Sequence, residues 1–219
     1  MNQIIEKTLK ALERNNMQGF YAETVDEARE LALSLIPVGS TVANGGSVTL
    51  KEIGLLESID KGDYTFIDRS LAKTPEELKE VYRKCFSADV YLSSTNALTT
   101  DGVLYNVDGT GNRIAAITYG PESIIIVVGK NKIVDSLSAA VERVKAIAAP
   151  PNCKRLSKET PCRKTGECIA CKNSDSTKTD NILDGCGSPA RICRDFLFTG
   201  VQAVKNRIKV IIVNEDLGY

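Results

Sequence analysis

Six of the seven cysteines in this chain of 219 residues fall between residues 153 and 193. Three of them form the run Cys162-x5-Cys168-x2-Cys171. A C-x2-C pair places two thiolates within reach of one metal ion, and a third cysteine lies one short loop away. Thiolate ligands alone suit a [4Fe–4S] cluster or a tetrahedral zinc site. The segment therefore predicts a metal–thiolate centre, with an iron–sulfur cluster as the first choice and zinc as the alternative.

The fourth ligand of this centre is open between Cys193 and Cys186, and Cys153 lies outside the compact run. We favour Cys193, because it lies beside the part of the chain that we expect to return to the main sheet. Cys186 lies in a polar stretch, whose ordering costs ~1–2 kcal/mol per residue in backbone entropy. The competing interpretation is a set of inert or disulfide-prone thiols.

A glycine-rich turn, Asn44-Gly45-Gly46-Ser47, follows a predicted strand and precedes a predicted helix. Such a turn leaves backbone N–H groups free at the positive end of a helix, where phosphate or carboxylate binds. Glycine lets a ligand approach the backbone, and Ser47 adds a hydroxyl donor. The turn is not G-x-G-x-x-G, so it does not predict NAD binding. The alternative is a plain turn that uses asparagine and glycine for their left-handed conformations.

A polar loop, residues 93–113, carries two aspartates, three asparagines and an arginine close to tight glycine turns. Asp101 or Asp108 would serve as a general acid or base if burial raised its pKa. Arg113 would clamp a carboxylate or phosphate with two hydrogen bonds. The alternative is two hairpin turns that flank a strand. The ligand-contact candidates of this loop are Asn96, Gly109, Asn112 and Arg113.

Lys130 follows the strand predicted at residues 123–129, so it stands at a carboxyl end as a further anion contact or as part of a solvated turn. Histidine is absent, which excludes Ser-His-Asp and Cys-His catalysis. The 28 basic and 28 acidic residues balance, and this gives no support to nucleic acid as a partner. We find neither a signal peptide nor a membrane span, and we expect a cytoplasmic protein with a small anionic substrate or ligand.

The elements that must position these residues alternate between strand and helix over residues 18–150. This alternation predicts an α/β fold with a mostly parallel sheet covered on both faces. We predict helices at 1–17, 24–36, 74–86, 112–120 and 135–147, a further helix at 196–206, and a final buried strand at 208–214. The pair Pro150-Pro151 marks a boundary. We therefore predict one domain, residues 1–219, with a cysteine-rich metal-binding flap at 151–195.

Several segments together make the sequence resemble the LUD-domain family, which includes lactate utilization protein C. They are NGGSVTLKEIG (44–54), NALTTDGVLYNVDGTGNRIAAITYGPESIIIVVGKNKIV (96–134), the TPCxxTGxCxxC run (160–171), RIC (191–193) and RIKVIIVNEDLGY (207–219). The resemblance covers most of the chain. It implies a Rossmann-like sheet of the type found in the sugar-phosphate isomerase and CoA-transferase superfamily.

The resemblance also implies that the NGGS turn and the DG…DGxGNR loop line one pocket. It assigns the cluster to Cys162, Cys168, Cys171 and Cys193. This chain departs from the family in the stretch NSDSTKTDNILDGCGSP, which separates the C-x2-C pair from the RIC element. Members of the family take part in the oxidation of lactate to pyruvate alongside iron–sulfur partner proteins.

The first functional hypothesis is therefore an accessory protein or subunit in the oxidation of lactate or a related 2-hydroxy acid, with iron–sulfur partner subunits. The second is a stand-alone enzyme acting on a phosphorylated sugar or an acyl-CoA. The third is a module that binds a small acid without turning it over. Whether the chain is itself an enzyme stays open at this stage.

Overall fold

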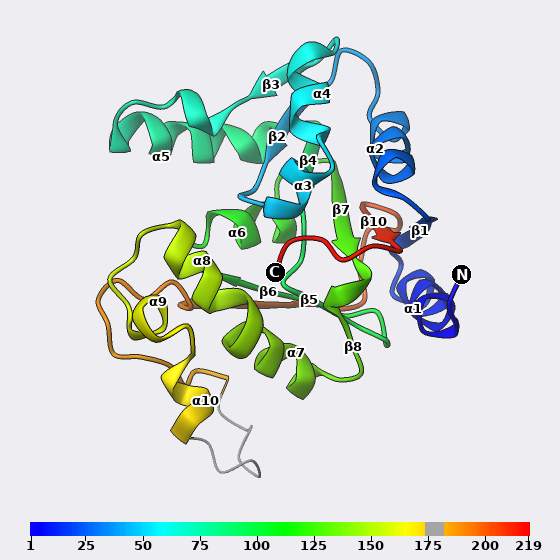
Figure 1. The fold of residues 1–219 in the computed structure, drawn as a ribbon. Coiled ribbons are helices and arrows are strands. Elements are labelled where there is room, and N and C mark those ends of the chain that lie inside the picture. The colour runs from blue at the N-terminus through cyan, green and yellow to red at the C-terminus, as the bar shows by residue number, and fades with distance from the viewer. Residues whose placement is uncertain (174–181) are drawn as a thin grey trace.

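The computed structural model describes residues 1–173 and 182–219, and a six-stranded sheet forms its centre (Figure 1). Every neighbouring pair of strands in this sheet is parallel. In spatial order the strands are β1 (Gln18–Ala22), β10 (Ile208–Val213), β7 (Ser123–Gly129), β4 (Val90–Ser93), β2 (Thr41–Asn44) and β3 (Thr65–Ile67). The α/β architecture with a mostly parallel sheet is as predicted, and the final strand does return to this sheet.

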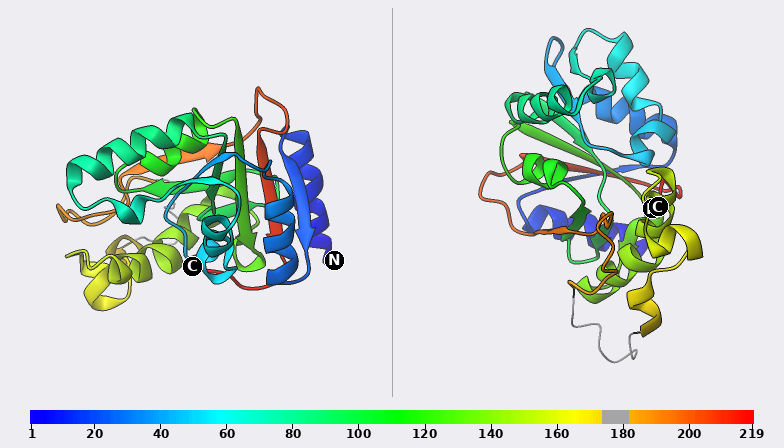
Figure 2. Two further views of the ribbon diagram at one scale, coloured as in Figure 1. Left: turned by 90° about the horizontal axis from the view of Figure 1, so that it is seen from above. Right: turned by 90° about the vertical axis from the view of Figure 1, so that its left-hand side faces the viewer.

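The central strand β7 shows why the sheet is covered on both faces. Ile124 and Ile126 pack into one apolar cluster, and Ile125 and Val127 pack into another on the opposite face. All four side chains are fully buried, and each such burial contributes about 1.5–3 kcal/mol. Helices α1 (Gln3–Arg14) and α6 (Asn112–Thr118) cover the first face, and α2 (Val25–Ser34), α3 (Val48–Glu52) and α4 (Leu55–Lys61) cover the second (Figure 2).

Two helices begin where the sequence signals place them. The Thr24 side chain accepts a hydrogen bond from the Glu27 backbone N–H at the start of α2. Thr74 does the same for Glu77 at the start of α5 (Pro75–Lys84), with proline in the first turn. These caps satisfy backbone donors that a helix leaves unpaired at its start.

The short elements between these helices and strands are η1 (Arg69–Leu71), η2 (Cys85–Ser87), η3 (Lys130–Lys132) and η4 (Val144–Ala148).

A second sheet of four strands lies beside the first. Its strand order is β8 (Ile133–Val134), β5 (Ala97–Thr99), β6 (Leu104–Asp108) and β9 (Asp195–Thr199). The helix predicted at 196–206 is wrong, because the first part of that stretch is strand β9, antiparallel to β6. Phe198 stacks on Tyr105 with ring centroids 4.6 Å apart, so a pairing partner ninety residues away overrides the local pattern.

Pro150 and Pro151 do not mark a boundary. They lie in the first turn of α8 (Ala149–Arg155), which continues directly from α7 (Leu137–Arg143) through the π-helical turn η4. A wider turn just before a proline pair accommodates the ring and the missing N–H group, so the helix does not break. The cysteine-rich part that follows contains α9 (Pro161–Thr165) and α10 (Ile169–Asn173).

The polar stretch that separates the C-x2-C pair from the RIC element lies partly outside the described residues, at 174–181. Within the part of the chain that is described, no helix has both the length and the apolar composition needed to cross a membrane.

Candidate functional site

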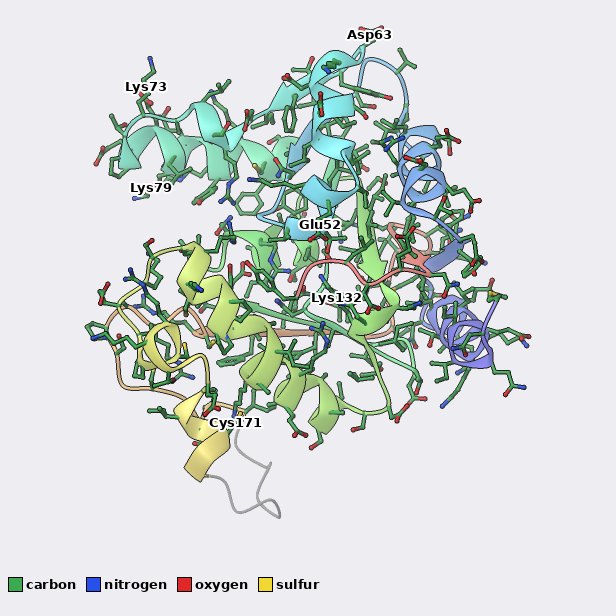
Figure 3. The ribbon with its side chains drawn as sticks, viewed as in Figure 1. Glu52, Asp63, Lys73, Lys79, Lys132 and Cys171 are labelled. Atoms are coloured by element: carbon green, nitrogen blue, oxygen red, sulfur yellow. The ribbon has the colours of Figure 1, made fainter. Side chains whose placement is uncertain are left out.

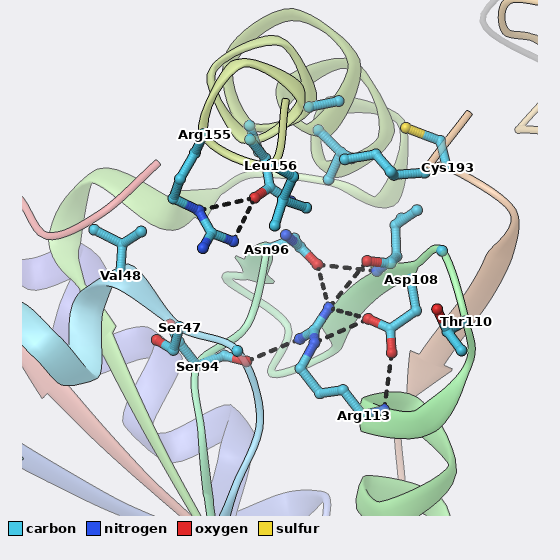
Figure 4. A pocket seen from close by; sticks show the side chains of 18 of the residues that line it. Ser47, Val48, Ser94, Asn96, Asp108, Thr110, Arg113, Arg155, Leu156 and Cys193 are labelled. Atoms are coloured by element: carbon cyan, nitrogen blue, oxygen red, sulfur yellow. Dashed lines mark hydrogen bonds and ion pairs between the residues drawn. The ribbon is translucent and has the colours of Figure 1, made fainter. Parts of the chain in front are cut away.

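A pocket of about 390 Å3 lies at the carboxyl ends of three neighbouring strands of the main sheet. Gly46 and Ser47 follow β2, Ser94 follows β4, and Lys132 follows β7. The polar loop closes a second side (Figure 4), and residues from α5, α8 and the C-terminal segment complete the wall. The glycine-rich turn and the DGTGNR loop, which are more than sixty residues apart in sequence, therefore border the same pocket.

Arg113 is the most constrained side chain of this site. It is 8% exposed, and its guanidinium has five N–H groups. Each of them donates to an oxygen of the protein (Figure 4). The acceptors are Asp108 Oδ1 at 2.9 Å, the Ser94 carbonyl at 3.1 Å, Asn106 Oδ1, Asn96 Oδ1 at 2.8 Å and the Val107 carbonyl at 3.0 Å. Arg113 therefore has no donor left for a ligand, which corrects the prediction that it clamps one.

Asp108 is equally committed. Its Oδ1 accepts from Arg113, and its Oδ2 accepts the backbone N–H groups of Arg113 and Ile114 at 3.0 and 3.1 Å. These bonds hold the first turn of α6 against the end of β6. A carboxylate paired in this way positions the pocket wall and is poorly suited to act as a general base. The predicted acid–base role of Asp108 is corrected to this positioning role.

Lys132 is the buried lysine of the pocket, with a side chain that is 3% exposed (Figure 3). Its Nζ lies 2.9 Å from Thr49 Oγ1 and 3.2 Å from Ser94 Oγ. Burial, together with the nearby cations of Arg143 and Arg113, lowers the pKa of Lys132 to about 7. A group with this pKa is present both as an amine and as an ammonium near neutral pH, as acid–base and nucleophilic lysines are.

The outer part of the pocket is cationic. Arg69, Arg155 and Lys158 all contribute to its lining. Arg155 is held in place by Asn152 Oδ1 and by the Tyr219 hydroxyl, which its Nε approaches to 2.8 Å. Among the described lining residues, Asp108 is the single carboxylate, and it is already paired with Arg113. The pocket therefore presents an excess of positive charge to whatever enters it.

The glycine-rich turn supplies space more than charge. A Cβ on Gly45 would lie 2.9 Å from the Arg113 side chain, and one on Gly46 would lie 3.3 Å from the Arg69 guanidinium. Ser47 Oγ caps α3 by accepting the Leu50 N–H, and α3 is only five residues long. The dipole of so short a helix adds little, so the cationic side chains carry most of the positive charge. Asn44 is buried beside the turn and does not line the pocket.

Two predicted site residues lie elsewhere. Asp101 is in an exposed turn, with its carboxylate 3.9 Å from Lys7 Nζ, and it is not part of the pocket lining. Lys130 is exposed and is not part of the lining, although it is only two residues from Lys132. Asp101 is in a turn, as the alternative interpretation of its segment expects, and Lys130 begins the short helix η3. Of the loop candidates, Asn96, Gly109 and Asn112 do line the pocket.

The cysteines between residues 153 and 193 lie near one another without forming a ready metal site. In the part of the chain that the structure describes, none of the seven cysteines forms a disulfide, and Cys193 is part of the pocket wall. Burial raises the pKa of the Cys193 thiol to about 12, with smaller contributions from Cys153, Cys168 and Cys162. Over residues 1–173 and 182–219, no group of three or more His, Cys, Asp or Glu side chains is arranged to hold a metal ion. The predicted ligands are therefore near one another, but the described arrangement does not fit a bound cluster.

Sequence reasoning missed the pocket cations Lys132, Arg69 and Arg155. Lys132 carried a usable signal, since it follows a fully buried strand and a β-carboxyl end is a common place for a ligand contact. The segment GKNK offers two lysines, however, and only the chain's path shows which one turns inward. Nothing in the sequences around Arg69 and Arg155 indicates that these two residues reach the pocket.

The fold and the pocket describe an α/β protein with a cation-lined cavity at the carboxyl edge of a parallel sheet. The chain matches the LUD domain over residues 5–213, and it belongs to this family. No curated protein is similar enough to the chain to count as a match.

Among solved structures, the chain is similar to a DUF162 family protein from Deinococcus radiodurans, with 13% identity, a TM-score of 0.51 and 96% of each chain covered. A ribose 5-phosphate isomerase A from Neisseria gonorrhoeae has 17% identity and a TM-score of 0.33, over 52% of this chain and 56% of that one. The first of these likenesses concerns the fold alone, and the second is too weak to support an inference.

Proposed function

We propose that this LUD-domain protein binds a small 2-hydroxy acid, such as lactate, and serves as an accessory protein or subunit in its oxidation. The observation that carries the proposal is the charge of the pocket. Arg69, Arg155 and Lys158 surround its outer part, Lys132 lies at its base, and the single carboxylate is neutralised by Arg113. Fixed positive charge in a concave site favours an anionic ligand.

The two zones of the pocket suit the two ends of such a ligand. The rim cations would hold the carboxylate, and Arg155 is well placed because its partners already fix its orientation. The hydroxyl carbon would then lie toward Lys132 and Ser94. In its amine form, Lys132 accepts the proton of the 2-hydroxyl group, and this is one of the proton transfers that oxidation to a 2-oxo acid requires.

The same oxidation must also deliver two electrons to an acceptor. An iron–sulfur cluster supplies one-electron acceptor chemistry, and we propose Cys162, Cys168, Cys171 and Cys193 as the residues that would hold it, with zinc as the alternative ion. The described positions of these cysteines do not fit such a group as they stand. Iron–sulfur partner subunits are therefore part of the proposal. A reducing cytoplasm would keep the seven cysteines from forming disulfides, which is the state that they have here.

Calorimetric titration of the full chain with L-lactate tests the pocket. Replacing Arg155 with glutamine is expected to weaken lactate binding by about tenfold, the typical size of one charge-assisted contact. Lys130→Met is the matched control, because it removes a lysine that lies outside the lining, and its affinity should be unchanged. Equal binding by all three proteins would contradict the proposed site.

A phosphorylated sugar is the second candidate, and the number of cations favours it. The carboxylate of a 2-hydroxy acid neutralises one of the four basic side chains of the pocket other than Arg113, whereas a phosphate monoester carries up to two negative charges. The hydroxyl groups of a sugar would also find polar partners in Ser47, Asn96 and Asn112. Competition between L-lactate and ribose 5-phosphate in the same titration decides between these ligands.

Acyl transfer to a glutamate is not favoured, because the described lining includes no glutamate. Binding without turnover would identify a small-acid-binding module.

A further inference from the structure

The base of the pocket holds a lysine in surroundings made mainly of hydroxyl groups and cations. Lys132 is 3% exposed and belongs to the lining, and its Nζ has Thr49 Oγ1 at 2.9 Å and Ser94 Oγ at 3.2 Å. Within the described residues, no carboxylate lies close enough to form an ion pair with it. A buried ammonium normally requires such a partner, so this site favours the uncharged amine.

Most of the charged groups that face Lys132 disfavour its charged form. Arg113 on α6 and Arg143 on α7 oppose its positive charge, and among the described residues Glu52 on α3 favours it. Glu52 instead accepts a hydrogen bond from the Gly218 backbone N–H at 2.6 Å. With a pKa of about 7, roughly half of the Lys132 side chains are neutral at pH 7, whereas an ordinary lysine is neutral in fewer than about one molecule in a thousand.

The two hydroxyl oxygens determine what a neutral Lys132 can do. An amine has two N–H bonds and one lone pair. Among the described residues, Thr49 Oγ1 and Ser94 Oγ lie within hydrogen-bond distance of Nζ, one acceptor for each N–H bond. The lone pair is then available to an electrophile in the pocket. Lys132 thereby differs from the rim cations, because its surroundings favour a nucleophilic amine.

We propose that Lys132 forms a Schiff base with a 2-oxo acid bound in this pocket. This deepens the proposed function, on which it rests, because the carbonyl carbon of the 2-oxo acid is the carbon that bears the hydroxyl group in the 2-hydroxy acid. The rim cations hold the carboxylate, and the carbonyl group meets the amine. Both ligands would bind in one orientation.

The step balances without any oxidant or reductant. The Nζ lone pair forms a bond to the carbonyl carbon, and one N–H proton moves to the carbonyl oxygen to give a carbinolamine. That oxygen then leaves as water with the second N–H proton, which leaves a C=N bond between the ligand and Lys132. The Thr49 and Ser94 hydroxyls lie where these protons leave the nitrogen, and they can relay them to the oxygen.

Borohydride trapping with pyruvate tests the proposal. The full chain is incubated with pyruvate at pH 7, treated with sodium borohydride and analysed by intact mass and peptide mapping. We expect one adduct per chain, located at Lys132. L-Lactate has no keto group and should give none. Acetone has a keto group but no carboxylate, and it should give about tenfold less adduct because it lacks the charge-assisted contact to the rim. Lys132→Met should lose the adduct, and Lys130→Met, the matched control, should retain it.

Peptide mapping of the unaltered protein keeps the test independent of whether Lys132→Met folds. Adducts spread over surface lysines, or no adduct at all, would overturn the Schiff base. Calorimetry with pyruvate and L-lactate separates the two proposals. Tight binding without an adduct removes the covalent step and leaves the proposed function intact, whereas loss of binding to both acids removes the proposed function as well. Trapping should also become faster between pH 6 and 8, as Lys132 loses its proton in the presence of Arg113, Arg143 and Glu52.

Discussion

The Arg113 network and the cysteine-rich segment border the same pocket but are stabilised in different ways. Each guanidinium N–H of Arg113 has an oxygen partner within the protein. The thiols of the cysteine-rich segment are weak donors and acceptors, and burial keeps Cys153 and Cys193 protonated by raising their pKa values. Hydrogen bonds within the chain thus fix the pocket wall around Arg113. We expect the wall formed by the cysteine-rich segment to depend more on what that segment binds.

The largest expected effect is at Arg113. Replacing it with alanine leaves the Asp108 carboxylate buried without its partner, and it should lower the free energy of unfolding by about 3–5 kcal/mol. Arg69→Ala is the comparison, since the Arg69 guanidinium lies over the Tyr82 ring, 5.8 Å from its centroid. That contact is worth about 0.5–1 kcal/mol. Urea denaturation measures both, and losses of equal size would show that Arg113 is not a structural centre.

A pH-dependent effect is expected at Lys132. Its folded pKa is about 7 and its ordinary value is 10.5, so between these values the unfolded chain binds more protons. The stability of the wild type relative to Lys132→Met should therefore rise with pH across this window, by at most about 1.4 kcal/mol per pH unit, and be lost as pH falls toward 7. Denaturation of both proteins at pH 7, 8 and 9 measures the slope. A flat difference would mean that Lys132 is charged in the folded protein.

Adjacent glycines give a finer comparison. Gly45→Ala would press against the fixed Arg113 side chain, 2.9 Å away, and should cost about 1–3 kcal/mol. Gly46→Ala would meet the end of the Arg69 side chain at 3.3 Å, which can move aside, and should cost less than about 1 kcal/mol. Thermal denaturation compares the two variants. A larger loss of stability in Gly46→Ala than in Gly45→Ala would mean that the rim, and not the Arg113 network, is the rigid part of the pocket.

The smallest stability effect is expected in the cysteine-rich segment. In metal-free protein, Cys168→Ser should change the free energy of unfolding by less than about 1 kcal/mol, because this thiol is only half-buried. After anaerobic reconstitution with iron and sulfide, the same variant should lose most of its bound iron and its absorbance near 400 nm. Cys85→Ser, in the core away from the segment, should bind as much iron as the parent. A parent chain that binds no metal would remove the proposed centre.

The sequence was sufficient for the parallel sheet, because SIIIVVG and IKVIIV are apolar at every position or nearly so, and only burial on both faces accounts for that. It was sufficient for α2 and α5, whose capping residues act locally. It was insufficient for β9, because the pairing with β6 and the Phe198–Tyr105 contact join residues far apart in the chain. The site has a different cause. Arg113 was recognised, but whether its donors face a ligand or the protein depends on how five acceptors in the nearby segment 94–108 are oriented when that segment packs.

The position of β10 has a consequence for the order of folding. This strand lies between β1 and β7, and β10 is the only sheet neighbour of β1 in the described chain. During synthesis, residues 18–22 must therefore wait for residues 208–213 to leave the ribosome before they can join the sheet. Contacts that span so much of the chain slow folding. The pocket matures equally late, since Tyr219, which orients Arg155, follows the same strand.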